Sequence, residues 1–363
     1  MKKNKNYVDL KDQPVPEGQH LLEVDDLKMY FHTEDGVVRA VDGVSYTLDR
    51  GETLGVVGES GSGKSVTAMT IMGLISMPPG KIEDGDVRYR GRSILEMSEE
   101  EMQHIRGNDI AMIFQDPMTS LNPVYKIGKQ VGEGLRLHRG YSKQEALQRA
   151  TELLDLVGIP EPEKRVNEYP HQFSGGMRQR VMIAMALACD PDILIADEPT
   201  TALDVTIQAQ IIELMQEMQE KNGNAIIMIT HDLGVVADMA DKIMVMYAGR
   251  PVEFGTAEEI FYESRHPYTW GLIRSIPEQA IDEKKPLTPI HGNPPSLMNL
   301  PEGCVFSPRC PYATDKCRKQ RPERVVTESG HYSACHYSGD PEFLKNAPET
   351  SRTRKVSKKG GEA

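Results

Sequence analysis

The stretch that decides the fold reads Gly58-Glu59-Ser60-Gly61-Ser62-Gly63-Lys64-Ser65. It fits the pattern G-x4-G-K-[ST], in which glycines let the backbone wrap closely around phosphate groups and point N–H donors inward. Residues 53–57 before it are apolar, as in a buried strand, and residues 65–74 after it suit a helix whose positive end faces the same charge. The pattern predicts that Lys64 reaches the β and γ phosphates of a nucleotide and that the Ser65 hydroxyl binds Mg²⁺.

A pair of carboxylates follows a second apolar run. Residues 193–196 read Ile-Leu-Ile-Ala and lead directly into Asp197 and Glu198. Beside a phosphate loop, Asp197 is expected to hold Mg²⁺, directly or through water. Glu198 is expected to polarise a water molecule in line with the γ phosphate. An acidic pair after a strand is otherwise usually a solvated loop, so this interpretation depends on the loop at 58–65.

Composition excludes several classes of protein. The 363 residues are 39% apolar and 26% charged, which is typical of a globular protein with a substantial core. The longest apolar stretches, such as 181–189, fall well short of the ~20 residues that span a bilayer, and residues 1–19 do not resemble a leader. We therefore expect a cytosolic chain, with any membrane channel formed by other chains. A net charge of −12 gives no indication of a nucleic-acid partner.

The order of the segments predicts an α/β fold. Residues 192–196, 225–230 and 242–247 are short, nearly all-apolar runs separated by helical segments. Such strands are buried on both faces, which indicates a parallel sheet with helices packed against it. Residues 117–180 are richer in Gln, Glu and Arg and predict a helical subdomain inserted into this core. Residues 1–20 are expected to be a flexible arm.

The last part of the chain changes in character. Prolines crowd the segment 266–340 and suppress helix and central strand, so we predict an irregular extension of a main domain at 21–265. Residues 341–363 are expected to be a disordered tail. Four of the five cysteines lie in the extension with the spacing C-x5-C-x6-C-x17-C, which in a reducing cytosol favours a metal over disulfides. The fifth, Cys189, lies in an apolar helical pattern and is expected to be a core residue.

One further segment narrows the class of nucleotide-binding protein. Residues 173–180 read Phe-Ser-Gly-Gly-Met-Arg-Gln-Arg. The segment resembles the LSGGQ signature of the ABC ATPases, with Phe for Leu and Met for Gln. The resemblance implies the fold of that family, a mainly parallel sheet with an antiparallel β subdomain and a helical subdomain. It also implies that this turn binds the ATP of a partner subunit in a head-to-tail dimer, through Ser174, Gly175, Gly176, Met177 and Gln179.

The same resemblance assigns roles to residues elsewhere in the chain. Gln115 looks like the Q-loop glutamine, which senses Mg²⁺ and touches the membrane partner. His231 looks like the switch histidine that contacts the γ phosphate. Residues 201–204 look like the D-loop, with Asp204 at the dimer interface. Phe31, with Tyr30 as the less favoured alternative, looks like the aromatic residue that stacks on adenine.

These assignments define three expected sets of site residues. The catalytic set is Glu198, His231 and Gln115. The Mg²⁺ set is Ser65, Gln115 and Asp197. The residues expected to bind ATP directly are Phe31, Gly58, Glu59, Ser60, Gly61, Ser62, Gly63, Lys64, Ser65 and Val66.

Longer segments resemble one group within the family. Residues 114–123, 169–173, 232–237 and 266–269, with the Pro- and Cys-rich end, are similar to the oligopeptide/dipeptide importers, a group that includes nickel importers. Within it the chain looks most like the D-type ATPase subunits of oligopeptide permeases, over about residues 21–340. The likeness implies an ATPase at the cytoplasmic face of the membrane. Its partners would be a related F-type ATPase subunit, two membrane permeases and an extracytoplasmic peptide-binding protein.

Two alternative functions stay open. An importer of nickel or another small solute would carry the same ATPase, because cargo selectivity lies in the other subunits. A soluble ABC ATPase acting on nucleic acid is the second alternative. It is disfavoured because the chain has one phosphate loop, one Ser-Gly-Gly turn and a negative net charge.

The resemblance further implies a [4Fe–4S] cluster held by Cys304, Cys310, Cys317 and Cys335. Four thiolates suit that cluster and equally suit a structural Zn²⁺, and an extension without any metal is the third possibility. We favour the iron–sulfur cluster, because the resembling group is associated with one and because the first cysteines lack the C-x2-C spacing of zinc sites. We expect its role to be structural, because a proline-rich segment with little core needs a staple.

Overall fold

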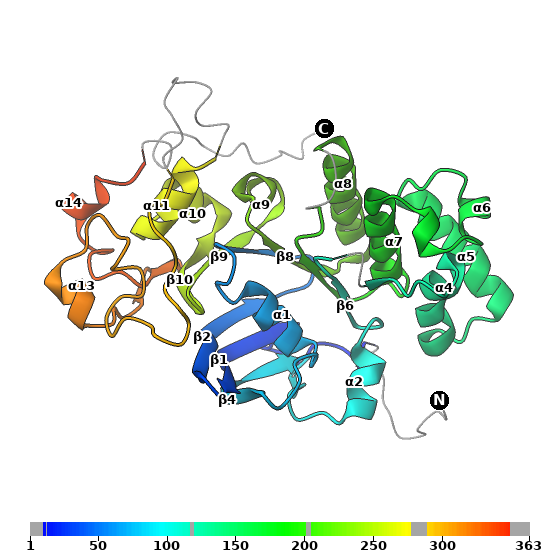
Figure 1. Ribbon diagram of the computed structural model, residues 1–363, viewed down its shortest axis with the longest axis horizontal. Coiled ribbons are helices and arrows are strands. Elements are labelled where there is room, and N and C mark those ends of the chain that lie inside the picture. Colours follow the sequence, from blue (N-terminus) through cyan, green and yellow to red (C-terminus); the bar gives the residue numbers. More distant parts are fainter. Residues whose placement is uncertain (1–9, 12, 117–119, 201–204, 277–288, 349–363) are drawn as a thin grey trace.

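The computed structural model describes residues 10–11, 13–116, 120–200, 205–276 and 289–348. Within these residues the strands form two sheets (Figure 1). The larger sheet has the order β11-β12-β10-β9-β3-β8-β7-β6, and the smaller one has the order β2-β1-β4-β5. The arrangement is therefore α/β, with a mixed sheet beside an antiparallel one, as the sequence predicts.

The strands and helices are bounded as follows. The strands are β1 (Leu22–Thr33), β2 (Gly36–Leu48), β3 (Thr53–Val57), β4 (Gly80–Tyr89), β5 (Arg92–Ser93), β6 (Ile110–Ile113), β7 (Ile193–Asp197), β8 (Ala225–Thr230), β9 (Lys242–Tyr247), β10 (Arg250–Thr256), β11 (Val325–Val326) and β12 (Tyr332–Ser333). The helices are α1 (Lys64–Ile71), α2 (Glu99–Ile105), α4 (Ile127–His138), α5 (Lys143–Leu156), α6 (Pro162–Arg165), α7 (Gly175–Leu187), α8 (Val205–Asn222), α9 (Leu233–Met239), α10 (Ala257–Tyr262), α11 (Pro267–Arg274), α13 (Asp315–Lys319) and α14 (Pro341–Leu344).

The centre of the larger sheet is parallel and buried on both faces. Strands β6, β7, β8, β3 and β9 pair in parallel, and β10 joins β9 antiparallel. Side chains of β7 alternate between two apolar clusters, with Leu194 in one and Ile193 and Ile195 in the other. Successive strand residues point to opposite faces, so both faces of this sheet are covered. The near-continuous apolar runs of the sequence follow from this double burial.

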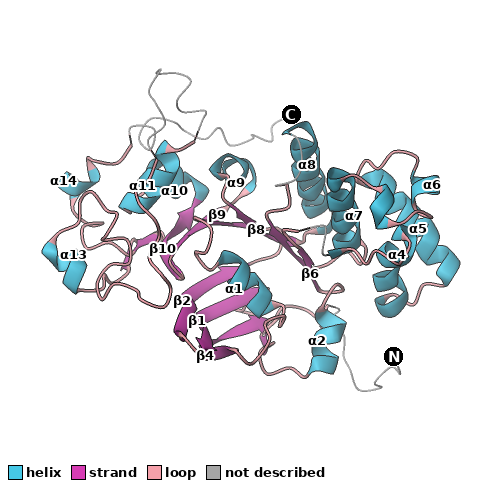
Figure 2. Ribbon diagram, viewed as in Figure 1, coloured by secondary structure: helices cyan, strands magenta, loops and turns pink. Residues whose placement is uncertain are grey.

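The helices α4 to α7 form a separate lobe beside the end of the larger sheet (Figure 2). Their apolar faces pack on one another and on the cluster that includes Leu153, Val181 and Leu194. Helix α5 begins at a capping box, in which the Ser142 side chain accepts from Glu145 N and the Glu145 side chain accepts from Ser142 N. Such a box pairs two of the N–H groups that a helix start leaves unbonded. The lobe lies on the region where the sequence predicts a helical subdomain.

Residues before β1 are packed more firmly than a flexible arm would be. Leu10 is 1% exposed and belongs to the cluster beneath β1. The Lys11 ammonium donates to the carbonyls of Cys189 at 3.2 Å and of Asp190. Arg90 donates to the carbonyl of Gln13. The arm expected for residues 1–20 is thus docked at these described positions, because its apolar residue finds a place in the core.

The extension is irregular, as predicted, but several of its aromatic side chains are packed together. Trp270 is fully buried, with its ring 5.6 Å from that of Tyr312 and 5.3 Å from that of Phe343. The short strands β11 and β12 add to the edge of β10, so the extension continues the larger sheet. Helix α14 lies in the segment predicted to be a disordered tail, and it differs from that prediction because Phe343 packs on Trp270.

No helix in the described part of the chain is both long and apolar enough to cross a membrane.

Candidate functional site

The phosphate loop lies between the carboxyl end of β3 and the start of α1, as the sequence predicts. Its glycines take backbone conformations that other residues rarely adopt, with φ of 151° at Gly58, 76° at Gly61 and 100° at Gly63. At Gly63 an added Cβ would lie 2.3 Å from the carbonyl oxygen of Ala40. A side chain at this position would therefore clash with the backbone of β2, so the loop requires glycine there.

Lys64 is held inside the loop. Its ammonium donates to the carbonyl oxygen of Gly58 at 2.7 Å and to that of Glu59 at 3.0 Å. The residue is only 6% exposed. Burial lowers the pKa of Lys64, while the nearby carboxylates of Glu198 and Asp197 oppose that shift. The charge is thus placed where phosphate groups would enter the loop.

Ser65 and Asp197 meet at the end of β7. The Ser65 side chain is hydrogen-bonded to the Asp197 carboxylate, and Asp197 is 4% exposed. Burial raises the pKa of Asp197, although the Ser65 hydrogen bond lowers it. Among the described residues, Asp197 Oδ1 is buried without a hydrogen-bond partner. A hydroxyl and a carboxylate oxygen with a free lone pair fit Mg²⁺, which prefers oxygen ligands.

Glu198 receives contacts from both neighbouring strands of the sheet. Gln115 follows β6 and donates from Nε2 to Glu198 Oε2 at 2.9 Å. His231 follows β8 and places Nδ1 3.1 Å from Glu198 Oε1. Strands β6, β7 and β8 are adjacent and parallel, so their carboxyl ends meet at one edge of the sheet, where α/β proteins bind ligands. The structure therefore brings together the three residues of the predicted catalytic set.

The backbone at Glu198 is unusual. Its φ is +47°, a left-handed conformation that non-glycine residues seldom take. Its N–H donates to the carbonyl oxygen of Ile229 at 2.8 Å, which holds this turn against β8. Such strained residues concentrate at functional sites, where the surroundings enforce the conformation. The turn aims the carboxylate across the end of the sheet toward Gln115 and His231.

The Ser-Gly-Gly turn begins α7 in the helical lobe. The Ser174 side chain accepts from Met177 N at 3.3 Å and caps the helix. Ser174 and Gly175 are exposed, which suits contact with another chain. Gln179 differs, because it is 1% exposed and donates from Nε2 to the carbonyl oxygen of Pro199 at 2.7 Å. Here its side chain braces the turn after Glu198.

Two further predicted residues remain predictions. Phe31 is half-buried and packs on the apolar cluster of β1, while the Tyr30 hydroxyl donates to Asp42 at 3.0 Å. Asp204, with the rest of the proposed D-loop at 201–204, lies outside the described residues.

The structure adds residues that no motif indicated. The hydroxyl of Tyr268 accepts from Glu59 N at 2.9 Å, and Arg309 binds the Glu59 carboxylate. The only available signal was the His266–Thr269 run, which the sequence associates with the extension and not with the phosphate loop.

The four cysteines of the extension line one small cavity, together with His266 and Phe306 among others. Burial raises the pKa of Cys310 to about 11 and that of Cys335 to about 12, and the neighbouring thiols add to both shifts. Within the described residues, no group of three or more His, Cys, Asp or Glu side chains is arranged to hold a metal ion.

Comparison with known families identifies two regions. The model described as ABC transporter matches residues 41–201. The model described as oligopeptide/dipeptide transporter, C-terminal region, matches residues 252–317. The first region contains the phosphate loop, the signature turn and Glu198, and the second contains three of the four clustered cysteines.

Individual proteins that resemble this chain are named as transport ATP-binding proteins. The chain is 58% identical over 312 residues to the oligopeptide transport ATP-binding protein of Bacillus subtilis (strain 168), covering 86% of this chain and 87% of that one. It is 52% identical over 320 residues to the dipeptide transport ATP-binding protein of Escherichia coli (strain K12), covering 88% and 97%.

Among solved structures, the fold resembles the ATP-binding cassette MJ0796 in a dimeric post-hydrolysis state bound to ADP and Pi. The TM-score is 0.60 at 28% identity, over 65% of this chain and 98% of that one. The matches to both transport proteins exceed half identity over most of the chain, and the two family regions follow one another along the sequence. The chain belongs to the ATP-binding proteins of ABC transporters, in the oligopeptide/dipeptide group.

Proposed function

We propose that this chain hydrolyses ATP to drive the import of oligopeptides or dipeptides. The observation that carries the hydrolytic part is the convergence of Gln115, Glu198 and His231 beside the phosphate loop. The peptide cargo is supported by the names of the relatives, which are transport ATP-binding proteins for oligopeptides and dipeptides. It is also supported by the C-terminal region at 252–317.

In the proposed mechanism, the residues at the edge of the sheet divide the tasks of binding ATP, holding Mg²⁺ and activating water. Lys64 and the loop N–H groups hold the β and γ phosphates of ATP, and Ser65 and Asp197 hold Mg²⁺ with Gln115 nearby. When bound, Mg²⁺ neutralises charge on the phosphates. Glu198 accepts a proton from the attacking water, and His231 and Gln115 fix the position of its two oxygens. A held carboxylate avoids the entropic cost of finding the reactive geometry.

A single chain supplies only half of each proposed ATP site. Residues Ser174 to Met177 would face ATP held by the phosphate loop of a second ATPase subunit, and we propose a related F-type chain for that partner. Two membrane permeases and an extracytoplasmic peptide-binding protein complete the proposed complex. The chain would then work at the cytoplasmic face of the membrane. No partnership with nucleic acid is proposed.

Reconstitution tests this function directly. The chain is co-expressed with its permeases and partner ATPase, and the complex is placed in vesicles with ATP inside and binding protein outside. We expect ATP-dependent accumulation of labelled peptide. Accumulation of labelled nickel in place of peptide would support the small-solute alternative. ATP hydrolysis stimulated by nucleic acid, without any transport, would contradict the importer.

For the cysteine cavity we propose a [4Fe–4S] cluster on Cys304, Cys310, Cys317 and Cys335, with Zn²⁺ as the alternative. The support is that all four side chains line the same cavity although they span more than thirty positions of the sequence. When bound, the cluster would act as a structural staple.

Anaerobic purification tests the cluster. We expect a brown protein whose visible absorbance, iron and sulfide disappear together in the Cys317→Ser variant. The matched control is Cys189→Ser, outside the cavity, which should keep the iron. A colourless preparation without iron would contradict the cluster, and one equivalent of zinc would support the alternative.

A further inference from the structure

The second residue of the phosphate loop is held by the extension. The two terminal nitrogens of Arg309 donate to the two oxygens of Glu59, at 2.5 Å and 3.0 Å. The Arg309 side chain is 4% exposed and that of Glu59 is 29% exposed. Paired contacts of this kind between a guanidinium and a carboxylate fix direction as well as distance. The contact therefore sets where Glu59 lies relative to the extension.

Arg309 is itself firmly placed. Its Nε donates to the carbonyl oxygen of His291 at 2.9 Å, and one terminal nitrogen donates to that of Ile290 at 3.0 Å. The other terminal nitrogen lies 3.3 Å from the Tyr247 hydroxyl. The guanidinium carbon is also 5.7 Å from the centre of the Tyr247 ring. With its planar fork occupied on every side, Arg309 has little freedom to follow Glu59 if the loop moves.

A second contact fixes the backbone at the same residue. The N–H of Glu59 donates to the hydroxyl of Tyr268, which is fully buried in α11. The Tyr268 ring packs 4.6 Å from that of Tyr247 and 5.3 Å from that of Phe306. Both the main chain and the side chain of Glu59 are thus bound by residues outside the nucleotide motifs.

The position of Glu59 affects Lys64, the lysine expected to bind phosphate. Lys64 donates to the carbonyl oxygens of Gly58 and Glu59, so a shift of Glu59 moves two acceptors of its ammonium. We propose that Arg309 is a positioning residue for the phosphate loop, through which the C-terminal extension sets the affinity of this subunit for ATP. Arg309 acts through Glu59 and is not among the residues expected to bind ATP. The proposal depends on ATP binding by the loop and is independent of the cargo.

Truncation of Arg309 is the first test. In the full chain, Arg309→Met should raise the dissociation constant for a non-hydrolysable ATP analogue about tenfold, a typical size for coupling between sites. The KM for ATP should rise by a similar factor while kcat changes far less, because Glu198, Gln115 and His231 are untouched. Arg309→Lys should fall between the wild type and Arg309→Met, because a point charge cannot replace a paired contact.

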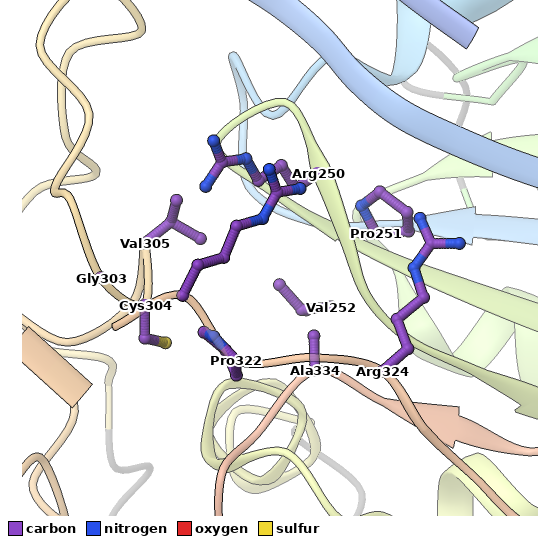
Figure 3. A pocket seen from close by; sticks show the side chains of 10 residues that line it. Arg250, Pro251, Val252, Gly303, Cys304, Val305, Pro322, Arg324 and Ala334 are labelled. Carbon is purple, nitrogen blue, oxygen red and sulfur yellow. The ribbon is translucent and has the colours of Figure 1, made fainter. Parts of the chain in front are cut away.

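A second arginine of the extension, Arg324, contacts the main domain elsewhere and provides a matched control variant. A cavity between β10 and the extension is lined by Arg250 and Arg324, among others (Figure 3). Arg324 donates to the carbonyl oxygen of Gly43 and lies over the Tyr332 ring, so it also ties the extension to the main domain. Arg324→Met should leave the affinity for the ATP analogue unchanged. If both variants weaken binding equally, Arg309 has only a general structural role and the proposal fails.

A double-mutant cycle adds a second readout. Glu59→Gln should weaken binding of the analogue, and adding Arg309→Met to it should cost little more, because both changes break the same contact. Independent, additive losses would overturn the proposal. If Arg309→Met does not fold, Glu59→Gln and Tyr268→Phe provide the test, since each removes one contact to Glu59. Unchanged affinity in both would also overturn it.

Discussion

At the level of single residues, the candidate site is organised around the Glu198 carboxylate. Each of its oxygens has a partner, Gln115 on one side and His231 on the other. The carboxylate is 14% exposed at its side chain, so it is sheltered but open to water. This arrangement suits a base that must hold one position and still exchange a proton.

Replacing this base should separate binding from hydrolysis. Glu198→Gln keeps the size and shape of the side chain but cannot accept a proton. We expect turnover to fall about 10²-fold or more, while the affinity for ATP stays within about twofold. The measurements are phosphate release and binding of a labelled analogue. The control is Glu213→Gln on the exposed side of α8, and full activity of Glu198→Gln would refute the assignment.

Asp42 provides a stability test with a defined pH dependence. It is 4% exposed, and Arg250 donates to it from Nε at 2.7 Å. Burial by itself raises the pKa of Asp42, but Arg250 and the Tyr30 hydroxyl lower it by more than burial raises it, so the net shift of the pKa is downward. Between the folded pKa and the unfolded value of about 3.9, the unfolded chain binds more protons. The pair therefore contributes its full stability above that range and loses it as the pH falls.

The Asp42→Asn variant should show this dependence. At pH 7 it should be less stable to urea by about 3 kcal/mol, because Arg250 keeps a buried charge without its counter-charge. The difference in unfolding free energy from the wild type should be constant down to about pH 5 and narrow below pH 4. A difference that does not change with pH would mean that Asp42 is not ionised in the folded protein.

At the level of strands and helices, the phosphate loop depends on close packing beneath it. Strand β3 carries Gly55 where α9 crosses, and an added Cβ would lie 2.3 Å from Val236 Cγ1 and 3.3 Å from Ala240 Cβ. The helix thus approaches the strand at a distance that only glycine permits. Because β3 leads directly into the phosphate loop, this packing fixes the position from which the loop starts.

Gly55→Ala should therefore destabilise the protein by overpacking, by about 1–3 kcal/mol. Adding Val236→Ala should recover part of that loss. The double variant should therefore lose less unfolding free energy than the two single variants lose together. Urea unfolding measures all three. Gly339→Ala is the control, since nothing lies within 4 Å of a Cβ there. Additive losses at Gly55 and Val236 would show that the two sites do not press on each other.

For the molecule as a whole, the exposed signature turn points to a site completed by a second subunit. Two helices of the same lobe begin with a serine cap, α5 at Ser142 and α7 at Ser174. Replacing either serine by alanine should cost about 1 kcal/mol of stability. Only Ser174→Ala should also reduce ATP-dependent association with the partner ATPase, because its hydroxyl faces the other subunit's ATP in the proposed dimer.

Light scattering of the two mixed subunits with Mg²⁺ and ATP measures this association. The Glu198→Gln background prevents hydrolysis and should stabilise the complex. Ser142→Ala in that background is expected to associate like the parent. Equal association of the Ser142→Ala and Ser174→Ala proteins would contradict the role of the signature turn at the interface.

Much of the fold, the phosphate loop and the acidic pair could be predicted from local pattern, and the resemblance to the ABC ATPases indicated Gln115 and His231. The phosphate loop, the two acids at the end of β7 and the glutamine and histidine after β6 and β8 each stand at the end of an apolar run. In a parallel sheet, such ends meet by necessity, so the convergence on Glu198 follows from strand order. The docked Leu10 and helix α14 were not predicted, because short apolar segments find their partners only in the packed core.

The nucleotide chemistry was therefore readable in the linear chain, because phosphate binding needs particular residues at fixed, short spacings. The surroundings of the phosphate loop required the folded chain. Glu59 and Arg309 are 250 positions apart, and no local spacing or periodicity encodes a contact at that distance. Gln179 is similar, since its burial against Pro199 depends on how α7 packs beside β7. Motifs define what the loop binds, whereas long-range packing defines what holds the loop.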